Sequence, residues 1–223
     1  MSDRLFVWKD KKTRSGAFAG VMLQLLKDEW VHVGLIYRTD TSRGTFVLHL
    51  RGHNLLLHDP PEKGQICVLP SIEPVRIPAL AAFARNIYRK NKHRGIPYSF
   101  SSPEHEWFAP DGQLILGEDR LGLTCSNFVL AIYRAAGLPL VQLHTWPSRQ
   151  EDKEWQNSVI GGWKAKVKND KKKREHLARM RKEIGAIRCR PIELAGAALS
   201  DEIPSTFAVA AGHVKEIEIL LFG

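Results

Sequence analysis

LTCSNF, residues 123–128, places a single cysteine, Cys125, at the point where an apolar helical pattern begins. Downstream, apolar residues recur at the spacing of a helix that buries one face: Phe128, Val129, Ile132, Tyr133 and Ala136. Gly137 and Pro139 then predict the end of this helix. The sequence therefore predicts a helix that begins at the cysteine, and the fold is organised around it.

A thiol in the first turn of a helix faces unpaired backbone N–H groups and the positive end of the helix dipole. Both favour the thiolate, so the sequence predicts that the pKa of Cys125 lies below the value of a free cysteine. Cys125 is on this ground the candidate nucleophile. The alternative, that it is a small hydrophobic residue of the core, stays open from this helix alone.

The composition is that of one globular domain: 223 residues, 43% hydrophobic and 26% charged. Three cysteines without paired spacing argue against a disulfide framework and favour a reducing compartment. Residues 1–4 lack a signal-peptide pattern, and the apolar run Ala17–Leu26 is too short to cross a bilayer. We therefore expect a cytoplasmic location and no transmembrane segment.

The formal net charge of +9 is local, because the segment Lys164–Arg190 holds 12 Lys or Arg and 3 Asp or Glu. Within it, Asn169 or Asp170 is placed to cap a helix that runs to Lys182. Such a surface attracts anionic lipid or nucleic acid, although charge runs are more often solvated faces. The candidate basic surface consists of Lys171, Lys172, Lys173 and Arg174.

The rest of the chain alternates between strand and helix patterns. Leu5–Trp8 predicts a strand or a docking segment, and the spacing of apolar residues over Phe18–Leu26 predicts a helix. Pro78 opens a further helix, and 139–162 reads as loop with short helical pieces. The other expected strands are a hairpin of 31–37 with 45–50, then 65–69, 186–189 and 214–222, the C-terminal ones joining the main sheet.

Two histidines on the expected hairpin complete a nucleophilic arrangement. Thiol chemistry needs an imidazole to take up the proton and a polar group that orients this imidazole. His32 lies between apolar residues of the first strand, and His49 lies on the next strand, where a cross-strand contact with His32 is expected. A histidine alone on a strand is more often half-buried and structural, so the order of the three residues carries the hypothesis.

A metal site is the alternative use of these histidines. His49, His53 and His58, with Cys67 or His32, are close in sequence. Gly52 and the run 55–57 rule out a helix that would bring the first two onto one face, and paired cysteines of the zinc-site kind are absent. We therefore expect no metal and no cofactor.

Five segments together resemble the circularly permuted branch of the papain-like NlpC superfamily, which includes lecithin-retinol-acyltransferase-like enzymes. They are Asp3–Val7, Trp30–Ile36 with the histidine motif, Val47–His49, Gly95–Tyr98, and Thr124–Val129 with the cysteine motif. The resemblance covers about residues 3 to 140 and implies a catalytic Cys125, a general base His32 and an orienting His49. It departs from the family at His49, where many relatives carry an acidic residue, and in the basic segment.

The sequence and this resemblance together predict an α+β fold. We expect one permuted papain-like domain over 1–223, with an antiparallel sheet packed on the cysteine helix and 141–190 as an insertion or appendage that holds a peripheral basic helix. The expected function is a thiol hydrolase or acyltransferase that cleaves a peptide, isopeptide or lipid ester through an acyl-enzyme on Cys125. Tyr98, Thr124 and Ser126 are candidate oxyanion donors or substrate wall. The alternative is a non-catalytic module that binds anions.

Overall fold

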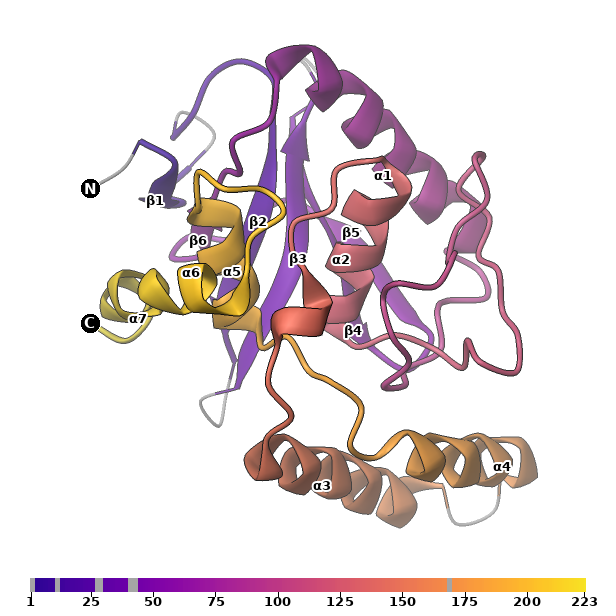
Figure 1. Ribbon diagram of the computed structural model, residues 1–223. Coiled ribbons are helices and arrows are strands. Elements are labelled where there is room, and N and C mark those ends of the chain that lie inside the picture. Colours follow the sequence, from indigo (N-terminus) through magenta and orange to yellow (C-terminus); the bar gives the residue numbers. More distant parts are fainter. Residues whose placement is uncertain (1–2, 11–12, 27–29, 40–43, 168–169) are drawn as a thin grey trace.

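The computed structural model describes residues 3–10, 13–26, 30–39, 44–167 and 170–223. It has an α+β architecture, in which helices pack on a six-stranded antiparallel sheet of strand order β1-β6-β2-β3-β4-β5 (Figure 1). The strands are β1 (Leu5–Val7), β2 (Phe18–Leu25), β3 (Val31–Arg38), β4 (Thr45–Gly52), β5 (Leu55–Asp59) and β6 (Ile66–Val68).

The prediction of a helix over Phe18–Leu26 is wrong, because this segment forms β2 in the middle of the sheet. Its residues from Phe18 to Leu23 are all buried. Val21 and Leu23 pack in the main core, whereas Phe18 and Met22 pack on the opposite face. A strand that is covered on both faces needs no polar alternation, so its apolar run imitates a buried helix.

The hairpin of β3 and β4 is confirmed, with Leu35 opposite Leu48 and Tyr37 opposite Phe46. Gly34 lets these strands approach closely, since a Cβ there would lie 2.8 Å from the Cβ of His49. β5, which the sequence pattern did not predict, pairs with β4 and places Leu57 opposite His49.

Helices α1 (Ile77–Asn91), α2 (Cys125–Ala135) and α5 (Pro191–Leu199) pack on one face of the sheet (Figure 1), and the C-terminal helices contribute to the same core. A short 3-10 turn at Pro74–Arg76 precedes α1. α2 contacts β3 and β4, and α5 contacts β2 and β3. Together with the strands they form the main core, around buried residues such as Leu35, Phe128 and Leu194. The opposite face holds a smaller cluster that contains Ile36 and Val47.

The C-terminal strand predicted at Val214–Phe222 is wrong, since this segment is helix α7 and follows α6 (Phe207–Gly212). Its core contacts come from Ile217, Leu220 and Leu221, which follow the helical i, i+3, i+4 spacing. The strand predicted at 186–189 is also wrong, since these residues belong to no strand of the sheet. β1 and β5 therefore form the two edges of the sheet, and no strand from the C-terminal part of the described residues joins it.

Helices α3 (Gln150–Lys166) and α4 (Lys171–Met180) lie side by side and project from the sheet domain as a helical arm (Figure 1). The loop predicted for 139–162 is therefore wrong in its second half, although a 3-10 turn occupies Leu143–Thr145. α4 is confirmed, and the side chain of Asp170 caps it by accepting from the N–H of Lys173 at 3.0 Å. Asn169, the other candidate cap, lies outside the described residues.

The arm shares a small apolar cluster with the loop that precedes α2. Phe100 of this loop packs with Val159 and Ile160 of α3 and with Met180 of α4. A further 3-10 turn, Arg181–Glu183, ends the arm. There the carboxylate of Glu183 accepts hydrogen bonds from the hydroxyl groups of Ser99 and Ser101. These contacts hold the arm against the sheet domain.

The helices within the described residues include none whose length and apolar character would suit a membrane crossing.

Candidate active site

Cys125 is the first residue of α2, and Thr124 is its N-cap. The hydroxyl of Thr124 accepts a hydrogen bond from the N–H of Asn127 at 3.1 Å, which fixes the first turn. The side chain of Asn127 in turn donates to the carbonyl of Ser101 at 2.9 Å and anchors the turn to the preceding loop. Cys125 is half-buried, whereas Cys67 and Cys189 are fully buried. It is therefore the cysteine that a reagent or a substrate reaches.

The prediction of a lowered pKa at Cys125 is wrong, because burial raises the pKa of this thiol above its ordinary value. The backbone N–H groups of Val33 and Ser126 and the charge of Arg188 act in the opposite direction but do not outweigh the loss of solvation. Cys125 is thus a thiol at neutral pH. A base must take its proton when the sulfur reacts.

Alkylation measures this protonation state directly. We expect the rate constant for the reaction of Cys125 with iodoacetamide to rise about tenfold per pH unit between pH 6 and 8.5, since only the thiolate reacts. Peptide mass spectrometry separates Cys125 from Cys67 and Cys189, and a Cys125→Ala variant gives the background rate. A rate that is already constant from pH 5 upward would instead indicate a stable thiolate.

The predicted contact between the two histidines is confirmed, with 2.8 Å between His32 Nε2 and His49 Nδ1. The other ring nitrogen of His49, Nε2, lies 3.5 Å from a carboxylate oxygen of Asp59 on β5. A carboxylate only accepts, so His49 carries its proton on Nε2 and presents Nδ1 as an acceptor. His32 must then donate from Nε2. This chain leaves Nδ1 of His32 as an unprotonated base.

His32 is neutral over the whole physiological range. Burial, followed by the nearby His49 and Arg51, lowers the pKa of His32 from 6.5 to about 3. Burial also lowers the pKa of His49, although Asp59 opposes this shift. A neutral imidazole is the form that accepts a proton from a thiol.

The lowered pKa of His32 predicts a loss of stability in acid. His32 binds a proton near pH 6.5 in the unfolded chain but only near pH 3 in the folded protein. The free energy of unfolding is therefore highest above pH 6.5 and falls as the pH drops below it. At pH 5 the loss from this residue is about 2 kcal/mol relative to pH 7. Urea unfolding at both pH values measures it. His32→Gln is expected to flatten the dependence, the exposed His93→Gln is not, and equal slopes in all three proteins would contradict the assignment.

Cys125 and His32 lie near each other, but the hydrogen bonds of the described residues include none between the sulfur and the imidazole. The backbone N–H of Val33, the residue next to His32, acts on the Cys125 thiol and lowers its pKa. α2 packs on the face of β3 that carries Val33, whereas His32 alternates with Ile36, which belongs to the other face. A hydrogen bond between the two groups must therefore form before the proton moves.

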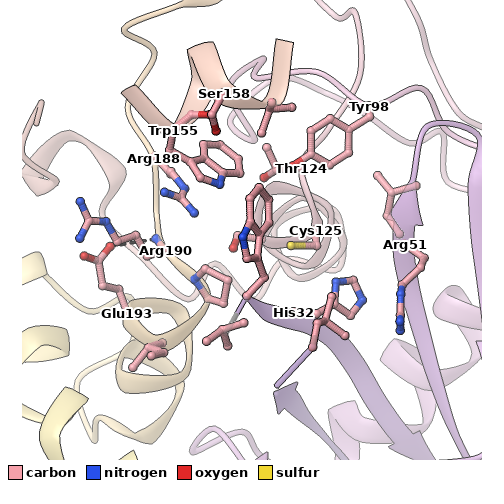
Figure 2. Close-up of a pocket in the computed structure, with 18 of the residues that line it drawn as sticks. His32, Arg51, Tyr98, Thr124, Cys125, Trp155, Ser158, Arg188, Arg190 and Glu193 are labelled. Carbon is pink, nitrogen blue, oxygen red and sulfur yellow. Dashed lines mark hydrogen bonds between the residues drawn. The ribbon is translucent and has the colours of Figure 1, made fainter. Parts of the chain in front are cut away.

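Both groups line one cavity of about 930 Å³ between the sheet, the arm and the C-terminal helices. Figure 2 shows Cys125 at the end of α2, with His32 below it and the side chains of Trp155 and Arg188 on the arm side. Other walls come from Leu50 of β4 and Phe207 of α6. This volume suits a small-molecule ligand or a short segment of a larger substrate.

No protein-family model, curated protein or solved structure matches this chain. The function of the site is therefore inferred from the residues that form it.

The cavity brings together most of the residues that the sequence singled out. His32, Tyr98, Thr124, Cys125 and Ser126 line it, whereas His49 lies behind His32 and does not. Burial, followed by the nearby Cys125, raises the pKa of Tyr98 well above 10.0. Its hydroxyl therefore keeps its proton and is available as a hydrogen-bond donor. The basic residues Lys171, Lys172, Lys173 and Arg174 are exposed on α4 and are not part of the cavity wall.

Sequence reasoning missed three groups that the fold places at the site. Asp59 supplies the acidic group behind His49, and it lies on a strand that was not predicted. Trp155 and Arg188 form the arm side of the cavity, with the Arg188 guanidinium carbon 3.5 Å from the centre of the Trp155 ring. Trp155 lies in the segment for which the sequence predicts a loop, and Arg188 lies in the basic segment, and no local pattern indicates that they face Cys125.

The histidines considered for zinc have other partners. His53 packs edge-on against Trp163 and accepts the N–H of Tyr98 at 3.3 Å. His58 shares a 2.6 Å hydrogen bond with the hydroxyl of Tyr37. Among the residues that the structure describes, no group of three or more His, Cys, Asp or Glu side chains is placed to hold a metal ion.

Proposed function

We propose that this protein is a cysteine-dependent hydrolase or acyltransferase that acts on an amide, peptide or ester bond. The observation that carries the proposal is a reachable thiol at a helix N-terminus, in a cavity that it shares with a neutral histidine whose tautomer a second histidine fixes. The order of histidine strand, orienting strand and cysteine helix along the chain is that of the permuted papain-like plan, and the antiparallel sheet with α2 on its face is compatible with it.

The mechanism begins with the transfer of the Cys125 proton to Nδ1 of His32 as the sulfur attacks the carbonyl carbon. The electrons of the carbonyl double bond move to oxygen. Backbone N–H groups in the first turn of α2, which have no partner inside the helix, lie on the side of this oxyanion, and the Tyr98 hydroxyl adds a donor. Collapse expels the leaving group, which takes the proton from His32, and leaves an acyl group on Cys125. Water or a second acceptor then releases the acyl group.

The proposal is tested with a panel of p-nitrophenyl esters of increasing acyl length and of peptide p-nitroanilides. We expect saturable release of p-nitrophenol or p-nitroaniline from at least one chemical class. Hydrolysis that is no faster than the buffer rate for every compound, together with a Cys125 that reacts no faster than Cys67 and Cys189 with iodoacetamide, would contradict the proposal.

A second candidate function rests on the outer face of the arm. Lys171, Lys172, Lys173 and Arg174 are all exposed on α4. Among the described residues, Lys171 lies near Glu175 and Lys173 near Asp170. Such a cluster attracts the phosphates of an anionic lipid surface or of nucleic acid.

For this surface we expect binding to phosphatidylserine vesicles or to duplex DNA that weakens as salt rises. Changing the four residues to Glu should abolish it. A matched variant changes four exposed basic residues near the end of α1, Arg89, Lys90, Lys92 and Arg94, to Glu and should keep it. Vesicle flotation and DNA filter binding measure the two ligands separately. Equal binding by both variants would rule out this role for α4.

A further inference from the structure

Five charged side chains form a cluster on the arm side of the cavity. Arg149 and Asp152 come from the start of α3, Arg188 and Arg190 from the extended segment after the arm, and Glu193 from α5. Arg188, Arg190 and Glu193 line the cavity itself. The cluster thus joins the arm, the return segment and the sheet domain at the wall that faces Cys125 (Figure 2).

Arg149 is fully used inside the cluster. Its Nε donates to Asp152 at 2.7 Å, its terminal nitrogens bind Glu193, and one of them also donates to the carbonyl of Arg188 at 3.0 Å. Glu193 is equally occupied, since it also accepts from the indole N–H of Trp146 and the backbone N–H of Arg190. These two residues are bound mainly to each other and to their neighbours, so they form a frame for the cluster.

Arg188 and Arg190, by contrast, share a single carboxylate oxygen. Asp152 Oδ1 accepts from Arg188 at 3.2 Å and from Arg190 at 2.9 Å, while its other oxygen serves Arg149. The two guanidinium groups that face the cavity are therefore compensated by less than one negative charge. The remaining charged groups on the cavity wall are Arg51 and the exposed Glu218.

Arg188 is held in place before any ligand binds. It stacks on Trp155, and its side chain is 19% exposed. Burial disfavours its charge and lowers its pKa, yet a guanidinium remains protonated, so its unused N–H donors are poorly solvated and face the cavity. Its charge reaches the thiol, because it acts to lower the pKa of Cys125. A planar, preorganised donor of this kind binds an oxyanion in two-point fashion.

We propose that Arg188, with Arg190, forms a subsite for an oxyanion, a carboxylate or a phosphate, carried by the molecule whose carbonyl Cys125 attacks. The identity of that molecule as a substrate rests on the proposed function, whereas the oxyanion site itself does not. The subsite selects acyl compounds with a negative charge on the arm side of the scissile bond and explains why the arginines of that wall are only partly compensated.

The binding test uses calorimetric titration of the wild-type protein with glutarate, inorganic phosphate and neutral glutaramide. We expect glutarate or phosphate to bind and glutaramide to bind at least about tenfold more weakly, as loss of a charge-assisted pair implies. The stronger of the two anions identifies the oxyanion as carboxylate or phosphate. Equal affinity for glutarate, phosphate and glutaramide, or no binding by any of them, would overturn the proposal.

Variants locate the site. Arg188→Gln is expected to weaken anion binding about 10- to 100-fold and Arg190→Gln to weaken it less, whereas Arg89→Gln, an exposed residue of α1, should change nothing. Arg190 is more exposed than Arg188, with 37% of its side chain accessible, so its variant remains informative if the Arg188 variant unfolds. Unchanged affinity in the folded Arg188 and Arg190 variants contradicts the assignment.

A turnover measurement separates this inference from the proposed function. p-Nitrophenyl hydrogen glutarate and p-nitrophenyl valerate differ in a terminal carboxylate, and we expect kcat/KM to favour the former about tenfold or more in the wild type only. The Cys125→Ala protein should still bind the anion. Anion binding without turnover would support the subsite and contradict the proposed function. Turnover with no anion binding and no preference for the charged ester would contradict the subsite alone.

Discussion

Replacing Cys125 by Ala is expected to lower turnover of any ester or amide that the protein cleaves by about 10⁴-fold or more, because Cys125 is the only cysteine among the described residues that line the cavity. The side chain is half-buried and small, so the variant should fold like the wild type. Initial rates at saturating and subsaturating substrate measure the loss. It should appear in kcat as well as in kcat/KM, since the bond to sulfur forms only during reaction.

The matched control is Cys67→Ala. Cys67 is buried on the far face of the sheet, and burial raises its pKa to about 12, so it cannot act as a nucleophile. This variant should lose some stability and keep its rate per folded molecule. Turnover that survives in Cys125→Ala but falls in Cys67→Ala would remove Cys125 from the mechanism.

Replacing His32 by Gln is expected to lower kcat by about 10²- to 10⁴-fold, the usual contribution of a general base. The structure shows no hydrogen bond between the sulfur of Cys125 and the imidazole of His32, so this loss of kcat tests directly whether His32 acts on the thiol. If His32 takes the thiol proton, added imidazole should restore part of the activity of an alanine variant at this position. A structural role for His32 would not respond to imidazole.

His58→Gln is the control for this second prediction. His58 lies on the same sheet and shares a partly buried hydrogen bond with Tyr37, but it does not line the cavity. Its replacement should affect stability without a specific loss of kcat. Equal losses of kcat in the His32 and His58 variants would show that both histidines act only through the fold.

The parts of the fold that could be predicted from the sequence are those with local signals. The helix from Cys125 has a capping threonine, a one-sided apolar pattern and a glycine after its end, and all three act locally. The hairpin that carries His32 and His49 is likewise dense in β-formers and brings the two rings together. Such elements need little information from the rest of the chain.

The errors arose where tertiary context overrides the local pattern. β2 is covered on both faces, so its run of apolar residues carries no strand alternation. α7 has apolar residues on both faces that a strand would present, so its local pattern does not separate strand from helix. Its packing on the core selects the helix. The Cys125 pKa was misjudged for the same reason, because the helix end alone favours thiolate and only the surrounding structure reveals the stronger effect of burial.

The arm illustrates a third kind of limit. Trp155 and Arg188 are more than thirty residues apart, and both are distant from Cys125 in sequence. They meet at the cavity because α3 and α4 fold back on each other and return the chain to the sheet domain. No periodicity within either segment encodes that return, so the charged wall of the cavity could not be predicted.

Intact-protein mass spectrometry during the pre-steady state tests the central claim most directly. The wild-type protein is mixed with the best p-nitrophenyl ester, quenched in acid and digested for peptide mapping. The account predicts a burst of p-nitrophenol, a matching fraction of protein that carries one acyl group on Cys125, and neither in the Cys125→Ala protein. Turnover without any acylated protein, or an acyl group on a residue other than Cys125 that forms at the rate of turnover, would contradict it.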